Sequence, residues 1–448
     1  MTRRSLNILM ICHRNRLDAY ARPHALAAQL VRRGHRVTLL LHSVNDRFGI
    51  RTFDWDGVRA VEIPDLLWGR MRTGWDPWNT LNRIYFLSRE KERYDLVHCF
   101  ETRPATIYPA LYFVRKHNLP WITDWNDWFG RGGLIEINRP GWYRTIFGGL
   151  ETYYEEAFRP KADGLTVIST ALADRASGLG LLPEQVCHIP GGTFPDWFKA
   201  RSKQECRLRM GFPMGAKILG FSSSTSHFDL EIVLKALKRV AAEYPDVMLV
   251  ITGKARKAVR EMVREFEVEA QVHFTGYVSL EALPWYLGCA DLFLLPMADR
   301  PYNWGRWPNK MCEYLSLGRP TVANPVGDIK SLFEKEQVGL LADWDAEDFA
   351  AKILHLLHNP NLAARLGEQA RLVAVNLYDW RKLGADLEAF YFRVLESREE
   401  GPRVGEPLAD DDVGKLAGSH PHSTGGSSIR QWLIAILKHY FLRAHLVS

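Results

Sequence analysis

The sequence is poor in cysteine and contains no long apolar run. Its 448 residues include 6 cysteines, and none of them has the paired spacing of a zinc site or a redox couple. No stretch of about twenty apolar residues is present, so no transmembrane helix is expected. The apolar run from Leu6 to Ile11 is interrupted by Asn7 and is followed by His13 without a small-residue cleavage site, which favours a buried strand over a signal peptide. These absences predict a cytoplasmic protein with reduced thiols.

Neither sign of charge dominates the composition. There are 58 Lys and Arg residues against 52 Asp and Glu residues, a net charge of +6 that does not call for nucleic acid as a partner. Hydrophobic residues make up 46% of the chain and charged residues 25%, as is typical of folded globular proteins. At this length we expect two or three domains.

The hydrophobic pattern alternates between strands and helices. An apolar strand over 6–12, a helix over 23–33 closed by Gly34, and a strand over 37–41 form a βαβ unit. Further strands are predicted in the first half over 58–63, 96–100, 121–124 and 164–169, with helices over 105–117 and 143–158. A Pro/Gly-rich segment over 186–192 separates a second series, with strands over 217–222, 247–252, 272–275, 292–296 and 321–323.

This order predicts an α/β protein made of two Rossmann-like domains that face each other across a cleft. The domains are expected over 1–190 and 191–378, followed by a crossover helix over 379–396 that packs on the first domain. Segment 397–428 is rich in Gly, Pro, Ser and acidic residues and predicts a flexible linker. A basic amphipathic helix is expected over 429–448.

The run from Pro308 to Pro320 is the most informative motif. Pro308 predicts a helix start whose free backbone N–H groups can meet an anion, and Lys310 adds positive charge there. Glu313 is expected on the same face, where a carboxylate can accept hydrogen bonds from two ribose hydroxyls. The motif therefore predicts a binding site for a nucleoside diphosphate.

Several motifs in order resemble the retaining glycosyltransferases with the B-type fold (glycosyltransferase family 4, or group 1). They are Gly34-His35-x-Val37-Thr38, Ile189-Pro190-x-Gly192, Gly276-Tyr277-Val278 and the run from Pro308 to Pro320. The resemblance implies that Glu313 binds the donor ribose, that Gly276 and Tyr277 flank the base, and that the backbone at Asn309 and Lys310 meets the pyrophosphate. It implies a nucleotide-sugar co-substrate, by default a UDP-sugar with GDP or ADP as alternatives, and no metal or other cofactor.

The sequence departs from the family pattern at two places. Gly305 stands where a first glutamate is usual, beside the transferred sugar. A Ser-rich stretch that begins Ser222-Ser223 replaces the usual Arg and Lys that hold the phosphates. Lys254, Arg306 and Lys310 are the candidates to supply the missing positive charge, although Lys254 also fits a solvated basic surface.

Polar residues follow the strand over 121–124 in the first half. Asn126 occupies the position of a family histidine, and Asp124 and Asp127 can orient an acceptor hydroxyl or cap strand-end amides. We expect Asp127 to be the functional aspartate. The basic residues Arg14, Arg16 and Arg22 follow the first strand and fit either an acceptor-side site or a solvated loop.

The function expected from the sequence is sugar transfer with retention of configuration to an unidentified glycan or lipid-linked acceptor. The alternative is a non-catalytic nucleotide- or glycan-binding protein with a degenerate fold of the same kind. A dehydrogenase is disfavoured because no Gly-x-Gly-x-x-Gly turn follows the first strand. The helix predicted over 429–446 can lie on an anionic membrane surface on the cytoplasmic side, or it can dock on protein.

Overall fold

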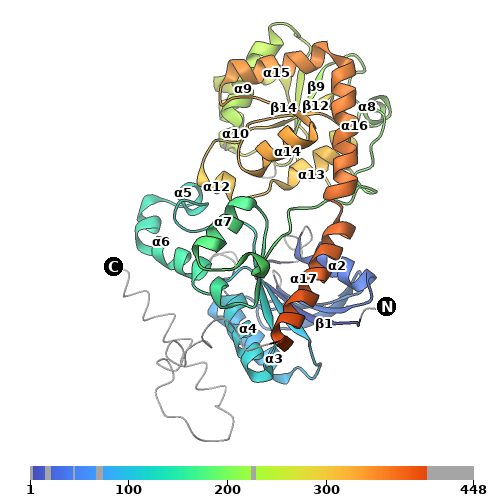
Figure 1. The fold of residues 1–448 in the computed structure, drawn as a ribbon. Coiled ribbons are helices and arrows are strands. Elements are labelled where there is room, and N and C mark those ends of the chain that lie inside the picture. The colour runs from blue at the N-terminus through green and yellow to red at the C-terminus, as the bar shows by residue number, and fades with distance from the viewer. Residues whose placement is uncertain (1–3, 16–21, 44–45, 67–73, 223–228, 401–448) are drawn as a thin grey trace, which may run out of the picture. The chain divides into compact units, whose positions relative to one another are not determined.

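The structure of the protein is a computed structural model that describes residues 4–15, 22–43, 46–66, 74–222 and 229–400 (Figure 1). The chain divides into two compact units. Unit 1 consists of Met1–Pro190 and the residues from Leu383 onward, and unit 2 of Gly191–Lys382. Arg16, Ser223 and the amphipathic helix expected over 429–448 lie outside the described residues, as does most of the linker expected over 397–428.

Unit 1 is built on an eight-stranded sheet with the order β3-β4-β2-β1-β5-β6-β7-β8. All neighbouring strands are parallel except β3, which pairs with β4 in the antiparallel direction. The strands are β1 (Asn7–Cys12), β2 (Arg36–His42), β3 (Arg51–Trp55), β4 (Val58–Ile63), β5 (Leu96–Phe100), β6 (Trp121–Trp125), β7 (Gly164–Val167) and β8 (Val186–His188). The main helices are α2 (Pro23–Arg32), α3 (Pro77–Arg89), α4 (Pro104–His117), α5 (Ile135–Asn138), α6 (Gly141–Glu156) and α7 (Thr170–Gly178).

The central strands of unit 1 are buried because helices cover the sheet. Every residue of β1, β5 and β6 is buried, as the near-continuous apolar runs of these strands predict for a parallel sheet. Cys12 pairs with Phe100, and Phe100 pairs with Asp124. The residues that directly follow β1, β5 and β6 therefore lie at one edge of the sheet.

The helix α17 (Trp380–Glu400) begins in unit 2, and from Leu383 onward it packs on unit 1. Glu388 accepts hydrogen bonds from Arg33 at 2.6 Å and pairs with His35 at 2.9 Å. The Tyr391 hydroxyl contacts His98 at 2.7 Å. A Cβ on Gly164 would lie 2.7 Å from the Phe390 ring, so this glycine permits the close approach of helix and strand.

Unit 2 contains a second, entirely parallel sheet of six strands in the order β11-β10-β9-β12-β13-β14. The strands are β9 (Ile218–Ser222), β10 (Met248–Thr252), β11 (Val272–Phe274), β12 (Leu292–Leu295), β13 (Thr321–Ala323) and β14 (Gly339–Leu341). The helices are α8 (Lys203–Met210), α9 (Leu230–Ala241), α10 (Lys257–Glu265), α11 (Leu283–Gly288), α12 (Pro301–Trp304), α13 (Asn309–Ser316), α14 (Asp328–Glu336), α15 (Ala346–His358) and α16 (Pro360–Leu377).

The topology of unit 2 brings its predicted site residues to one edge. Because the strands are parallel, Ser222 at the end of β9 shares an edge with the segments that follow β10, β11 and β12. Ligands of open α/β sheets bind outside the carboxyl ends of the strands. Among the residues that the structure describes, no helix is both long enough and apolar enough to cross a membrane.

Candidate functional site

In unit 2, the predicted motif forms a helix start at the carboxyl edge of the sheet. Helix α13 begins at Asn309 after Pro308, and no side chain caps its first turn. The first N–H groups of an α-helix have no intrahelical acceptor, and the helix dipole adds partial positive charge there. The first turn, which carries Asn309 and Lys310, is thus suited to bind an anion.

Tyr314 fixes helix α13 against strand β9. Its hydroxyl accepts a hydrogen bond from the backbone N–H of Ser222 at 2.7 Å, and its ring stacks on Phe293 at a centroid distance of 4.0 Å. The Ser222 side chain hydrogen-bonds Glu313. The other carboxylate oxygen, Oε2, is buried and has no hydrogen-bond partner among the described residues. Glu313 therefore keeps one acceptor oxygen for a ligand.

The charges around Glu313 are held in a desolvated setting. Burial raises the pKa of Glu313 to about 7, although the nearby Lys310 opposes this shift. Burial lowers the pKa of Lys310 to about 8, and Arg306 lowers it further, while Glu313 opposes the shift. The Lys310 amine lies over the Phe221 ring at 4.5 Å. Lys310 and Arg306 thus lie at this edge of the sheet together with Glu313, whose ionised form is destabilised by burial.

Asp229 and Asn303 complete the cluster, and our sequence analysis missed both. Asp229 follows the undescribed segment 223–228 in a left-handed conformation (φ 65°) and accepts from Asn303 Nδ2 at 3.4 Å. Burial raises the pKa of Asp229 although the Ala298 backbone and Arg306 oppose the shift. Arg306 Nε and Asn303 Oδ1, like Glu313 Oε2, are buried without a partner among the described residues. Buried polar atoms in native proteins are usually paired, so this concentration of unpaired ones indicates a ligand site.

The other predicted donor-side residues form a second group at the same edge. The backbone N–H of Gly253, next to Lys254, donates to the Gly276 carbonyl at 3.0 Å. Gly276 has a φ of 71° and open space around its Cβ position, and Tyr277 is 84% exposed. Lys254 is exposed as well. Gly305 ends helix α12 with a φ of −78°, in a conformation open to any residue.

In unit 1, the side chains of Asp124 and Arg22, for which the sequence left two roles open, form an ion pair. The Arg22 guanidinium binds both Asp124 oxygens at 2.7–3.2 Å and donates to the Ile189 carbonyl at 2.7 Å. Thr166 donates to Asp124 at 2.6 Å. The side chains of Asp124 and Arg22 are 0% and 7% exposed, so the two groups form a buried ion pair. The pKa of Asp124 is lowered because Arg22 outweighs the effect of burial.

Asn126 and Asp127 lie in a loop that buried carboxylates hold in place. The backbone N–H of Asn126 donates to Glu101 at 3.0 Å, and those of Phe129 and Gly130 donate to Glu155 at 2.8 and 2.7 Å. The Asn126 Oδ1 atom is buried and has no partner among the described residues. Asp127 is partly exposed, and Arg14 lies 3.8 Å from its carboxylate. The structure thus brings together Asn126, Asp127 and Arg14 of the predicted acceptor-side residues.

Glu101 and Arg159 are further residues that the sequence analysis missed. Glu101 directly follows β5, has a left-handed φ of 70°, and accepts from Arg159 at 3.0 Å. Burial raises its pKa to about 7 although Arg159 opposes the shift. The rule that singled out Asp124, a polar residue at the end of a buried strand, could have found Glu101. A non-glycine residue with positive φ stores backbone strain, which is common in functional loops.

Within the described parts of the chain, no group of three or more His, Cys, Asp or Glu side chains is placed to hold a metal ion.

Comparisons with known proteins identify the two halves of the chain. Residues 23–197 match the family described as Glycosyltransferase Family 4, and residues 216–359 match Glycosyl transferases group 1. An MMP alpha-(1->4)-mannosyltransferase of Mycolicibacterium hassiacum is 22% identical over 70% of this chain and 74% of its own length. Two further curated glycosyltransferases align over only 50% and 64% of their own length.

Solved structures share the fold. Sucrose-phosphate synthase from Thermosynechococcus elongatus superposes with a TM-score of 0.69 at 18% identity and covers 88% of this chain and 100% of its own. The Anabaena protein HepE in complex with UDP and glucose gives a TM-score of 0.63 at 15% identity, with 86% and 99% coverage. Since the two family matches fall on both units and two Rossmann-like domains are present, the chain is a group 1 glycosyltransferase with the B-type fold.

Proposed function

We propose that the protein transfers a sugar from a nucleoside-diphosphate sugar to a glycan or a lipid-linked acceptor in glycan biosynthesis, with retention of configuration and without a metal ion. The observation that carries the proposal is the cluster at the start of α13. Buried polar atoms of Glu313, Arg306 and Asn303 have no partner there among the described residues, and Lys310 lies beside them.

Each group in the cluster suits one part of the donor. The free oxygen of Glu313 can accept a hydrogen bond from a ribose hydroxyl. Lys310, Arg306 and the first-turn amides of α13 can bind the pyrophosphate. In the transfer step, the bond between the sugar and the phosphate breaks, the acceptor oxygen binds the sugar carbon, and the acceptor proton passes to the leaving phosphate. Fixed positive charge stabilises the leaving group in this step, and no protein nucleophile is required.

UDP is the donor nucleotide that we favour. The solved structure of HepE, which has the same fold, contains UDP and glucose. The exposed Tyr277 ring next to Gly276 is available to contact a base, but it does not select one. GDP and ADP are therefore alternatives for a binding screen.

On the acceptor side, Asp127 is the proposed catalytic residue. Its partly exposed carboxylate beside Arg14 can orient an acceptor hydroxyl, and Asn126 offers an unpaired amide oxygen. Glu101 and Glu155 act as positioning residues because they hold the backbone of this loop. Arg14 adds positive charge for an anionic acceptor.

Calorimetry with UDP tests the donor site through Glu313→Gln. We expect a loss of about 1.5–3 kcal/mol in binding free energy, because the substitution removes the charge from the acceptor of a ribose hydroxyl. Glu334→Gln is the matched control, since Glu334 is an exposed glutamate on α14 of the same unit. Equal UDP affinity in wild type and Glu313→Gln would refute the assignment.

The alternative is a non-catalytic nucleotide- or glycan-binding protein. Gly305 in place of the family glutamate and the Ser-rich stretch after β9 favour it. Release of UDP from UDP-sugars separates the two proposals. Turnover that Asp127→Asn abolishes supports the enzyme, whereas binding without any release of UDP supports the alternative.

Attachment to a membrane through residues 429–446 is a separate proposal that rests on sequence alone. Trp432, Leu433, Ile436 and Tyr440 have helical spacing, and Lys438 is among the basic residues. This helix would hold a cytoplasmic enzyme at the inner face of an anionic membrane. Deletion of 427–448 should release the protein from anionic vesicles in a flotation assay, and equal partition of both forms would refute the proposal.

A further inference from the structure

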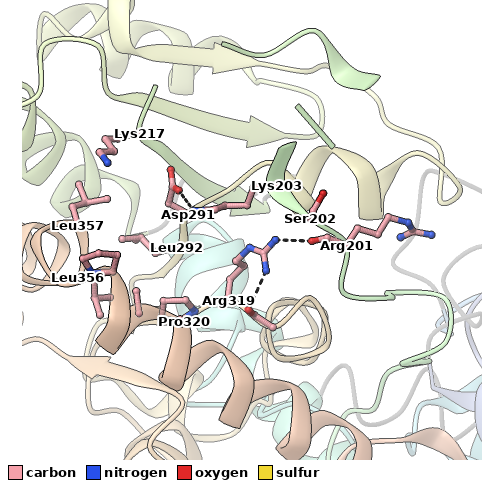
Figure 2. A pocket seen from close by; sticks show the side chains of 14 residues that line it. Arg201, Ser202, Lys203, Lys217, Asp291, Leu292, Arg319, Pro320, Leu356 and Leu357 are labelled. Atoms are coloured by element: carbon pink, nitrogen blue, oxygen red, sulfur yellow. Dashed lines mark hydrogen bonds and ion pairs between the residues drawn. The ribbon is translucent and has the colours of Figure 1, made fainter. Parts of the chain in front are cut away.

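A pocket of unit 2 lies at the edge of the sheet opposite to the α13 site. Its walls include Lys217 just before β9, Asp291 just before β12 and Arg319 just before β13 (Figure 2). Its volume is about 340 Å³. Lys217 and Ser222 lie at opposite ends of β9, and five residues of strand span roughly 17 Å. The pocket is therefore separate from the donor site.

The acidic group in the wall has its hydrogen bonds already made. Asp291 accepts from Lys203 at 2.5 Å, from Arg207 at 2.8 Å and from the backbone N–H of Ile218 at 2.8 Å. A ligand that brings hydroxyl donors would therefore find few free acceptors. Unmodified sugars fit this wall poorly.

The basic groups of the wall, in contrast, are in excess. Among the described residues, Lys217 makes no ion pair, and its amine lies 5.8 Å from the Tyr244 ring centroid. Among the described residues, the Arg319 guanidinium donates to the backbone carbonyls of Ala290, Leu317, Gly318 and Arg201. Asp291, the carboxylate whose charge acts on Arg319, is already paired with Lys203 and Arg207. Lys203 keeps N–H donors beyond its bond to Asp291. The pocket thus holds uncompensated positive charge, which favours an anion.

The remaining wall is apolar. Leu356 and Leu357 come from the end of α15, Pro320 precedes β13, and Ala363 and Ala364 belong to α16. Leu356 and Pro320 are buried, so this wall is firm. A pocket of this volume is at the lower end of the range for small organic ligands, and a single water takes up only about 30 Å³. An inorganic anion would leave much of the apolar wall uncovered.

We propose that this pocket binds an organic phosphate monoester with a short apolar body. The phosphate contacts Lys217, Lys203 and Arg319, and the body packs against Leu356 and the α16 alanines. A phosphate fits better than a carboxylate because the wall carries several cations and because three acceptor oxygens can take up their N–H groups. The site is independent of the sugar-transfer proposal.

Calorimetry with hexyl phosphate on the full-length protein tests the pocket. Inorganic phosphate serves as the probe for the phosphate group alone, and hexanol as the probe for the apolar body alone. We expect hexyl phosphate to bind more tightly than either. Lys217→Glu should weaken hexyl phosphate binding about tenfold or more, since a charge-assisted hydrogen bond is lost and a like charge is added. Ala364→Phe should also weaken it by filling the apolar side from an exposed helical position.

Lys330→Glu is the control, because Lys330 is exposed on α14 outside the pocket. Its hexyl phosphate affinity should equal that of the wild type. Circular dichroism and the thermal midpoint establish that each variant is folded. The absence of hexyl phosphate binding, or binding that neither Lys217→Glu nor Ala364→Phe weakens, would overturn the proposal.

Discussion

The two units place charged residues at the carboxyl ends of their strands in opposite ways. In unit 1, Arg22 pairs with Asp124 and Arg159 pairs with Glu101, and all four side chains are nearly inaccessible. In unit 2, by contrast, Lys310, Arg306 and Glu313 make no ion pair among the described residues, and Glu313 Oε2 is buried without a hydrogen-bond partner there. A charge that is paired and buried supports the fold, whereas one that is desolvated but unpaired is available to a ligand.

The largest expected effect comes from breaking the buried ion pair between Arg22 and Asp124 in unit 1. Asp124→Asn should lower the apparent free energy of unfolding in urea by about 3–5 kcal/mol, because it leaves the Arg22 charge buried without a counter-ion. Glu136→Gln is the control in the same unit, since its pair with Arg144 is about 40% exposed and should contribute about 0–1 kcal/mol. Similar small losses in both variants would show that the buried pair is not structural.

Asp127→Asn should lower turnover and leave the free energy of unfolding nearly unchanged. Its carboxylate is partly exposed and lies 3.8 Å from Arg14, so stability should change by less than about 1 kcal/mol. Turnover should fall about 10²-fold or more, because the carboxylate no longer orients the acceptor hydroxyl. Turnover assays and urea unfolding on the same preparation give both values. Wild-type turnover in Asp127→Asn would remove the catalytic role.

Lys310→Met tests the α13 site of unit 2, where the lysine has no ion pair among the described residues. UDP affinity should fall by about 1.5–3 kcal/mol through loss of a charge-assisted contact. Stability at pH 7 should rise, because the folded-state pKa of about 8 lies below the ordinary 10.5, so the free-energy cost of the charge builds up as the pH falls from 10.5 to 8 and is complete below 8. Lys330→Met is the control for both measurements. A loss of stability in Lys310→Met would mean that the amine has a structural partner.

The pH dependence of UDP binding tests whether Glu313 and Lys310 contact the nucleotide in their charged forms. Affinity should fall below about pH 7 as Glu313 takes up a proton and above about pH 8 as Lys310 loses one. The raised pKa of Glu313 also means that its contribution to stability is full below its ordinary 4.5 and is lost as the pH rises through 7. Glu313→Gln should abolish the acidic limb in calorimetry, apart from the ionisation of the nucleotide phosphate near about pH 6. An acidic limb that persists unchanged would assign it to another group.

The smallest expected effect is that of chelation. EDTA should leave UDP release unchanged, because in the proposed mechanism Lys310, Arg306 and the α13 amides would supply the positive charge at the phosphates. A strict requirement for Mg²⁺ or Mn²⁺ in the same assay would refute the metal-independent mechanism.

Much of the fold could be predicted because buried parallel strands are near-continuous apolar runs. The strands over 6–12 and 96–100 match β1 and β5 closely. Strands β3, β8 and β14 were missed because all three are edge strands with exposed or partly exposed residues, so none of them is a long buried apolar run. The helix start at Pro308 was found because its signal is local.

Part of the site could not be predicted because it depends on contacts between distant residues. Arg22 and Asp124 are 102 positions apart, so the sequence offers no sign that they neutralise each other. The strand also continues to Trp125, one residue beyond the predicted end, which keeps Asp124 inside the sheet and leaves Asp127 as the first partly exposed aspartate. The role of Asp229 depends on Asn303, 74 residues later.

The packing of α17 has a consequence for the order in which the protein folds during synthesis. Unit 2 is inserted in the sequence between Pro190 and Leu383. The residues of unit 1 that contact Glu388, Phe390 and Tyr391 are therefore synthesised long before these three residues. At about 5–20 residues per second, the ribosome needs roughly 10–40 s to bridge that gap. Unit 2, whose residues are contiguous, can complete its fold first, while the nascent unit 1 exposes the apolar surface around Gly164. A chain ended at Lys382 should bind a chaperone or aggregate where the full chain does not, and equal solubility of the two would show that unit 1 folds without its last helix.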